Sequence, residues 1–170
     1  MRMSNRRIVS ILMMLVLVPM VAAVANREHV LGRFLDPPMS ITVDLSERQL
    51  MVYKNGELTE TYGVAVGRDD FPTPTGSFQT GKIEWGPRWV PPKSDWARDE
   101  IPREAGDPEN PMQGVKIYFQ YPDYYIHGTN APGSIGTAAS HGCLRMNVGD
   151  AMALASEIEQ YGSVPMTIQQ

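Results

Sequence analysis

Apolar and polar residues alternate along several short segments of the chain, which predicts a domain built mainly from β-strands. The alternation is clearest in 41–45 and in 164–168, where every second residue is apolar, as in a strand with one face in a core. Between two such segments, Asn55-Gly56 is typical of a type I′ hairpin turn. The other segments predicted as strands are 50–53, 58–66, the residues around Phe78 that follow the turn at 72–76, 115–119 and 124–126.

One segment near the C-terminus has the spacing of an amphipathic helix instead. Its apolar residues recur at i, i+3, i+4 and i+7, at Ala151, Leu154, Ala155 and Ile158. Asn147 is placed to cap the start, and Gly162 is placed to end the helix. The sequence therefore predicts a mainly β fold with one helix packed on a sheet.

The segment 83–114 follows neither period. It contains six prolines and all three tryptophans of the chain, Trp85, Trp89 and Trp96. A loop of this length inside a compact domain is usually functional or disordered, and the tryptophans argue against disorder. Two interpretations remain open: a lid over a groove, or a structural loop held in place by its tryptophans.

The first 25 residues have the composition of an export signal. Three arginines precede a mainly apolar run, 8–18, which Pro19 interrupts before the small residues Ala23-Val24-Ala25. We expect 1–25 to be a signal peptide, so that the protein is exported to the periplasm or cell wall. The alternative is an uncleaved inner-membrane anchor, because 8–24 is almost long enough to span a bilayer.

The remainder of the chain is acidic and contains one cysteine. We expect 26–38 to be a linker and 39–169 to be a single domain. Without the predicted signal, 12 Lys+Arg stand against 19 Asp+Glu, a net charge of −7. This charge argues against a nucleic-acid partner. A single cysteine cannot form an internal disulfide, so in an exported protein it is either buried and inert or a free reactive thiol.

The sequence around this cysteine favours a reactive thiol. Cys143 lies in Ser140-His141-Gly142-Cys143-Leu144-Arg145, and His127 lies sixteen residues before it. A thiol needs a nearby base and a cationic setting to act as a nucleophile at neutral pH. We expect His127, at the end of a predicted strand, to reach the thiol as that base from a neighbouring strand. Arg145 can stabilise a thiolate or bind a substrate carboxylate.

The local sequence also suggests how the cysteine would meet a substrate. If His141-Gly142-Cys143 is extended, the His141 and Cys143 side chains share one face. Gly142 would then let a substrate approach the backbone closely. The amides of Gly142 and Cys143 would be donors to the oxyanion that forms at an attacked carbonyl.

Three other interpretations compete with a catalytic thiol. Cys143 could be a small buried apolar residue. His127, His141 and Cys143 could bind zinc, although the sequence shows neither a fourth ligand nor a zinc spacing motif, so we predict no metal. Either histidine, His141 more readily than His127, could be a hydrogen-bonded core residue.

Two motifs together resemble a known family. His127-Gly128-Thr129-Asn130, followed by Ser140 to Met146, closely resembles the signature of the L,D-transpeptidase (YkuD-type) catalytic domain. The resemblance extends upstream to 41–45, Gly67 and 72–76, so it covers roughly 39–169. It implies a mostly β, sandwich-like domain without cofactors that cross-links peptidoglycan in the periplasm or outer wall.

The resemblance also implies a role for each matching residue. Cys143 would be the nucleophile and His127 the proton donor and acceptor, oriented by the backbone carbonyl of Gly128. Four further residues would contact the substrate or the oxyanion: Ser140, His141, Gly142 and Arg145.

The implied reaction is the formation of 3→3 cross-links between stem peptides through a cysteine thioester. Two alternatives keep this site and change the acceptor: water, giving a carboxypeptidase or amidase, or a lysine of a wall-anchored lipoprotein. An alternative of another class is a non-catalytic wall-binding module, which would need neither Cys143 nor His127.

Overall fold

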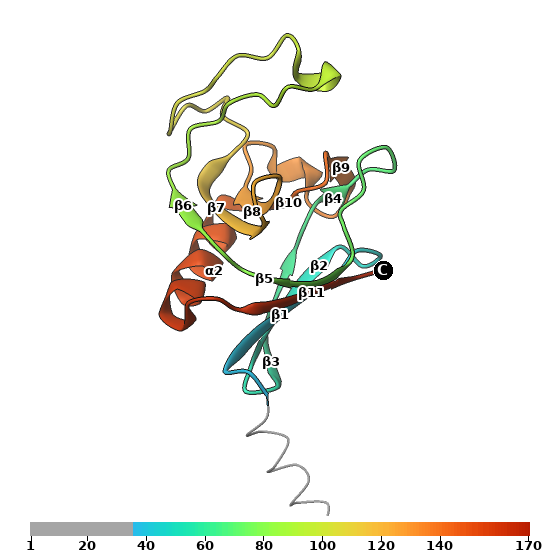
Figure 1. The fold of residues 1–170 in the computed structure, drawn as a ribbon, viewed down its shortest axis with the longest axis vertical. Helices are drawn as coiled ribbons and strands as arrows, with labels where there is room; N and C mark the ends of the chain where they lie inside the picture. The colour runs from blue at the N-terminus through green and yellow to red at the C-terminus, as the bar shows by residue number, and fades with distance from the viewer. Residues whose placement is uncertain (1–35) are drawn as a thin grey trace, which may run out of the picture. The chain divides into compact units, whose positions relative to one another are not determined.

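The structure is a computed structural model that describes residues 36–170. The predicted signal peptide and the predicted linker up to residue 35 lie outside the described residues. Within the described part, the chain folds mainly into strands with one α-helix, as the sequence predicted (Figure 1). None of its helices is long and apolar enough to cross a membrane.

The largest sheet has five strands in the order β3-β2-β1-β11-β5. They are β1 (Met39–Asp44), β2 (Gln49–Lys54), β3 (Glu57–Gly63), β5 (Gly76–Gln79) and β11 (Pro165–Gln169). β11 pairs parallel with β1 and antiparallel with β5, so the last strand of the chain lies inside the sheet. The predicted hairpin between β2 and β3 is confirmed, and both Asn55 and Gly56 have positive φ, as a type I′ turn requires.

The predicted strand 58–66 is in fact two strands. β3 ends at Gly63, and β4 (Val66–Gly67) pairs in parallel with β9 (Ala138–Ser140) in a separate small sheet. Between them Ala65 exchanges backbone hydrogen bonds with Arg145. The chain therefore leaves the five-stranded sheet at Val64 and connects it to the segment that carries the cysteine.

A second sheet has four strands in the order β10-β8-β7-β6. They are β6 (Ile83–Trp85), β7 (Gln113–Gln120), β8 (Tyr124–Gly128) and β10 (Leu144–Met146). The sequence predicted an irregular loop from residue 83 onward. This prediction was wrong for 83–85, which form β6 and pair antiparallel with 115–117. The remaining 86–112 loop connects β6 to β7 and includes a short 3₁₀ helix, Asp95–Ala97; a second, Pro132–Ser134, follows β8.

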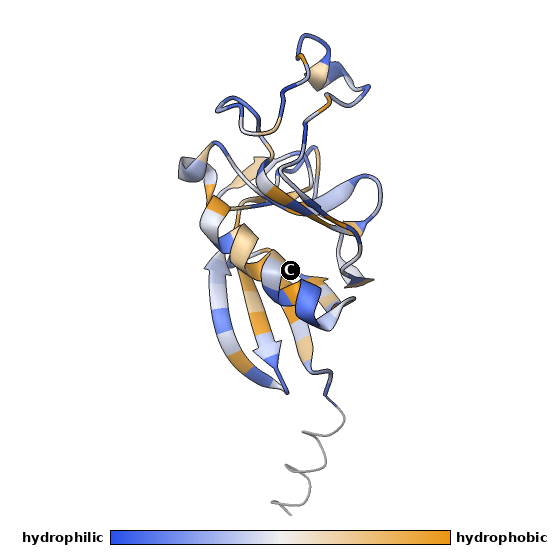
Figure 2. Ribbon diagram, turned by 90° about the vertical axis from the view of Figure 1, so that its left-hand side faces the viewer, coloured by the Kyte–Doolittle hydropathy of each residue, from blue (hydrophilic) through white to orange (hydrophobic). Residues whose placement is uncertain are grey.

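One apolar core joins both sheets and the helix. α2 (Val148–Tyr161) packs against β7 and β8, and its colouring alternates between orange and blue along its length (Figure 2). Its buried residues are those predicted: Ala151, Leu154, Ala155 and Ile158. Gly162 follows the helix with φ 76°, and Asn147 stands at the N-cap without a side-chain capping bond.

The residues of β7 separate this core from a polar face. Val115, Ile117 and Phe119 are buried in the core, so the alternating residues Lys116 and Tyr118 point to the opposite side of the sheet. This polar face is where the predicted site residues gather.

Candidate active site

The polar face of the four-stranded sheet is the floor of a cavity of about 880 Å³. The cavity is lined by Cys143, by both predicted histidines and by Arg145, which the fold brings together from β8, β10 and the segment before β10. The 86–112 loop supplies the opposite wall with Val90, Pro92, Ser94, Trp96 and Glu100. Sequence positions that are far apart therefore share one cavity.

His127 is buried in β8 and held in one tautomer. Its side chain is almost fully enclosed, and Nδ1 donates a hydrogen bond to the carbonyl oxygen of Gly128 at 2.9 Å. Because Nδ1 carries the hydrogen, Nε2 has the free lone pair. Burial lowers the pKa of His127 to about 4, and the positive charges of Arg145 and Lys116 act in the same direction. The ring is therefore neutral at pH 7 and able to accept a proton.

Gly128 has a packing reason to be glycine. A Cβ at this position would lie 2.4 Å from the carbonyl oxygen of Gln113 and 3.1 Å from Cα of Val148. The backbone of β8 thus passes close to β7 and to the start of α2, which fixes the carbonyl that holds His127.

Cys143 is half-buried at the edge of the floor, and its Sγ lies 3.5 Å from the carbonyl oxygen of Asp123, to which the thiol can donate. Burial raises the pKa of the Cys143 thiol to about 11. Hydrogen bonding to Tyr125 and the charges of Lys116 and Arg145 lower it, but not enough to offset burial. In the resting site the Cys143 thiol and the His127 imidazole are therefore both neutral.

The segment before the cysteine bends at Gly142, so the condition under which His141 and Cys143 would share one face is not met. Gly142 has φ 103°, and a Cβ there would lie 2.7 Å from Cε1 of Tyr124. Glycine is needed for this bend and for the close contact with Tyr124. The Gly142 amide donates to Oγ of Ser140 at 3.0 Å, and that hydroxyl donates to the Cys143 carbonyl at 2.5 Å. In this arrangement the Gly142 amide is not available as an oxyanion donor, and Ser140 braces the bend.

His141 lies between two aromatic rings. Trp96 stacks on it with 3.7 Å between ring centroids and 12° between ring planes, and Phe71 meets it edge-on at 4.9 Å. Burial, Arg68 and Arg145 lower the pKa of His141. The contact with Trp96 joins the 86–112 loop to the cysteine segment.

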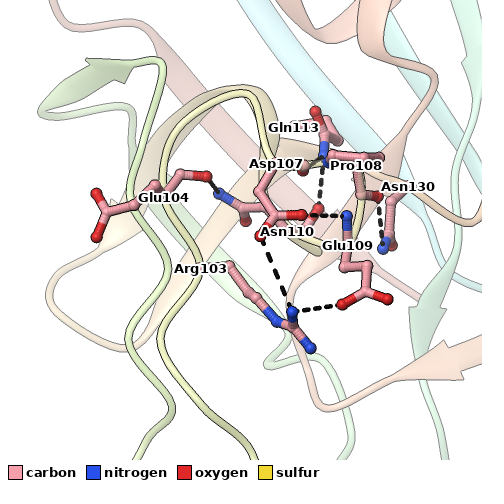
Figure 3. A network of polar contacts seen from close by, with 8 residues as sticks. All are labelled: Arg103, Glu104, Asp107, Pro108, Glu109, Asn110, Gln113 and Asn130. Atoms are coloured by element: carbon pink, nitrogen blue, oxygen red, sulfur yellow. Dashed lines mark hydrogen bonds and ion pairs between the residues drawn. The ribbon is translucent and has the colours of Figure 1, made fainter.

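Polar contacts order the base of the 86–112 loop (Figure 3). Asn110 donates to the carbonyls of Pro87 and Glu104 at 2.9 and 3.1 Å, and Arg103 forms ion pairs with Asp107 and Glu109. Trp89, buried, is paired with Arg103 through backbone hydrogen bonds. The base of the loop is thus held by polar contacts, and both the base and the Trp96 end contribute residues to the cavity lining.

If the Trp96 end is a lid, its removal should expose the thiol. We expect Trp96→Ala to speed the modification of Cys143 by a bulky maleimide roughly 2- to 10-fold, since an aromatic stack is worth about 0.5–1.5 kcal/mol. Modification by small iodoacetamide should change less. Trp85→Ala is the matched control, because Trp85 bonds to Glu159 and does not line the cavity. Equal maleimide rates for the wild type and Trp96→Ala would contradict a lid and leave a structural loop.

Sequence reasoning placed Trp96 in a possible lid but missed four other residues that line the cavity: Arg68, Lys116, Tyr118 and Tyr125. The alternation in 115–119 was a signal for Lys116 and Tyr118, because it placed both on the face opposite the core. Among residues 36–170, no three His, Cys, Asp or Glu side chains converge on a possible metal site.

Comparison with known proteins relates this fold and site to one family. The family model for the L,D-transpeptidase catalytic domain (YkuD) matches residues 38–166. The YkuD protein of Bacillus licheniformis is 32% identical over 130 residues, which cover 76% of this chain and 66% of that protein. The chain thus spans just under two thirds of that relative's length.

Solved structures share the fold. The catalytic domain of the Enterococcus faecium L,D-transpeptidase aligns with a TM-score of 0.60 and 22% identity, covering 79% of this chain and 98% of that domain. L,D-transpeptidase 3 of Mycobacterium tuberculosis was solved with a faropenem-derived adduct. It aligns with a TM-score of 0.59 and 18% identity, covering 79% of this chain and 61% of that protein. With the family model matched over most of the sequence, these findings lead to one conclusion: this chain belongs to the L,D-transpeptidase (YkuD) catalytic-domain family.

Proposed function

We propose that the protein is a peptidoglycan L,D-transpeptidase that forms 3→3 cross-links through a thioester on Cys143. The observation that carries the proposal is the placement of Cys143 and the tautomer-fixed His127 on the floor of one cavity. Family membership supports peptidoglycan stem peptides as the substrates. The catalytic domain in this proposal is 39–169, exported by the signal peptide 1–25 to the periplasm or cell wall.

The first half-reaction transfers the donor stem to the cysteine. Sγ of Cys143 attacks the carbonyl of the third, diamino acid residue while Nε2 of His127 takes the thiol proton. Because the resting thiol and imidazole are both neutral, this proton moves as the sulfur–carbon bond forms. The carbon–nitrogen bond then breaks, and His127 returns the proton to the amine of the leaving D-alanine.

The second half-reaction resolves the thioester. The side-chain amine of a second stem attacks the acyl carbon, His127 removes a proton from that amine, and the Cys143 sulfur leaves and regains a proton. A thioester suits this step because amines attack it readily. The product is an amide between the third residues of two stems.

Incubation of the purified protein with tetrapeptide muropeptides tests the proposed function. We expect mass spectrometry to show a 3→3 dimer together with released D-alanine. Tripeptide products alone would identify water as the acceptor and the protein as a carboxypeptidase. In a second incubation that also contains a lipoprotein-derived lysine peptide, stems joined only to that peptide would make it an anchoring enzyme. Unchanged muropeptides in both incubations would contradict catalysis.

The same nucleophile should open reactive β-lactams. We expect incubation with a carbapenem to add one covalent adduct to the intact protein, and prior alkylation of Cys143 to prevent it. The adduct found on the M. tuberculosis relative supports this expectation. An unmodified mass, in a preparation that cross-links stems, would contradict an open acyl-enzyme site.

A further inference from the structure

Four charged or titratable side chains form a row across the four-stranded sheet. Each of these residues lies directly opposite the next one on the neighbouring strand. Arg145 on β10 pairs with His127 on β8, His127 pairs with Lys116 on β7, and Lys116 pairs with Glu84 on β6. Partners directly opposite one another project from the same face of a sheet. His127 therefore has a cation on either side, Arg145 and Lys116, and Lys116 is the one to which the sequence assigned no role.

Lys116 is buried in the floor without a carboxylate to neutralise it. Its residue is 8% exposed, and its Nζ lies 5.1 Å from the centre of the Tyr125 ring. Within residues 36–170, no carboxylate oxygen lies within 4.0 Å of this amine. An ammonium that lines the cavity without an ion pair attracts an anion that enters the cavity.

Glu84, the neighbour that could have neutralised Lys116, makes other contacts. Its carboxylate accepts a hydrogen bond from the Tyr118 hydroxyl at 3.2 Å and pairs with Lys82 at 3.6 Å. Lys116 lines the cavity together with the nucleophile and the base. The positive charge thus remains available to a ligand.

The order of Cys143, His127 and Lys116 across the sheet matches the order of the scissile carbonyl, the leaving nitrogen and the α-carboxylate at the C-terminus of a peptide. Cys143 precedes β10, His127 lies on the next strand, and Lys116 lies on the strand after that. If the scissile carbonyl of a substrate lies at Cys143, its leaving nitrogen lies near His127. The leaving residue then extends toward Lys116. In a C-terminal residue the α-carboxylate is two bonds from that nitrogen. Directly opposed Cβ atoms lie about 5 Å apart, so a single residue suffices to reach from one side chain to the next.

Building on the proposed function, we propose that Lys116 binds the terminal α-carboxylate of the leaving residue. The ligand class is a peptide with a free C-terminal carboxylate, one residue beyond the scissile bond. Lys116 would thereby restrict acylation to stems that end at the fourth residue. Arg145, on the strand that follows the cysteine, remains for the acyl part of the donor.

Two synthetic stems that differ only at the C-terminus test this inference. One ends in D-alanine as the free acid and the other in D-alanine carboxamide, and acylation of Cys143 is followed by intact mass in single turnovers. We expect the wild type to prefer the free acid roughly 10- to 100-fold, the range for a hydrogen bond to a charged group. Lys116→Met should slow the free acid to the rate of the carboxamide, and Lys116→Arg should retain most of the preference.

Two further variants separate this role from a general effect of charge. Lys54→Met removes a positive charge on the five-stranded sheet outside the cavity lining, and we expect it to keep the preference. Arg145→Met should slow both stems alike. Circular dichroism and thermal unfolding show whether each variant is folded.

The outcomes distinguish this inference from the proposed function. A wild type that acylates with both stems at equal rates, or a folded Lys116→Met that keeps the full preference for the free acid, overturns the role of Lys116 and leaves the transpeptidase intact. A wild type that acylates with neither stem overturns the proposed function, and the inference with it.

Discussion

Replacing Cys143 with alanine is expected to abolish D-alanine release and cross-linking while leaving the fold intact. Loss of a nucleophile typically lowers turnover by a factor on the order of 10⁴–10⁶. The fold should persist because Cys143 is half-buried and the variant removes one sulfur atom, whereas the neighbours Leu144 and Met146 keep their places in the core. Release of D-alanine from a tetrapeptide stem measures the activity. Circular dichroism and the melting temperature show whether the fold is intact.

Cys143→Ser should be almost as inactive. A hydroxyl is a much weaker nucleophile than a thiol, and a histidine whose pKa is lowered to about 4 is a weak base for it. Without a nucleophile, the residual activity should be very low. The assignment of Cys143 as the nucleophile would therefore be contradicted if Cys143→Ala released D-alanine at more than about a hundredth of the wild-type rate.

The second large effect concerns the two histidines, which the structure makes unequal. We expect His127→Gln to slow single-turnover acylation about tenfold more than His141→Gln, since general acid–base catalysis supplies roughly 10²–10⁴. His127 has a fixed tautomer and a free Nε2, whereas His141 lies between Trp96 and Phe71 and is placed to shape the cavity wall.

The pH dependence provides a separate test of these roles. In the wild type, His127 has a pKa lowered to about 4 and is unprotonated above that pH, so acylation should be level at neutral pH and fall as the pH drops through 4. In His127→Gln only the thiolate reacts, and with the thiol pKa raised to about 11 the rate should rise about tenfold per pH unit across the neutral range. Greater damage from His141→Gln, with loss of the acid limb in that variant, would mean that the two roles are reversed.

Local patterns predicted the elements whose signals are local. The period of two in 41–45 and 164–168 and the four apolar positions of the helix were confirmed as β1, β11 and α2. The hairpin at Asn55-Gly56 follows from two residues that tolerate positive φ. Three-residue β6 is too short to show a period, so it could not be recognised.

Features that depend on distant partners could not be predicted in this way. The apolar run through Val64, Ala65 and Val66 looked like the end of one strand, but its partners, Arg145 and Ala138, are distant in sequence. The same holds for the site: the sequence suggested His127 beside Cys143, but the register of β7 against β8, which adds Lys116, is a tertiary property. Burial, also tertiary, outweighs the cations around the thiol and raises its pKa.

The most direct test of the central claim is the mass and position of the acyl group on the protein. The protein is mixed with a tetrapeptide stem whose side-chain amine is blocked, quenched in acid, and then digested with trypsin at a near-neutral pH that preserves a thioester. We predict an adduct equal to the stem less its terminal D-alanine, released by hydroxylamine as a thioester should be, and assigned by fragmentation to Cys143 within peptide 117–145. An adduct on another residue, or cross-linked stems that accumulate without any adduct when an unblocked acceptor stem is also supplied, would contradict the account.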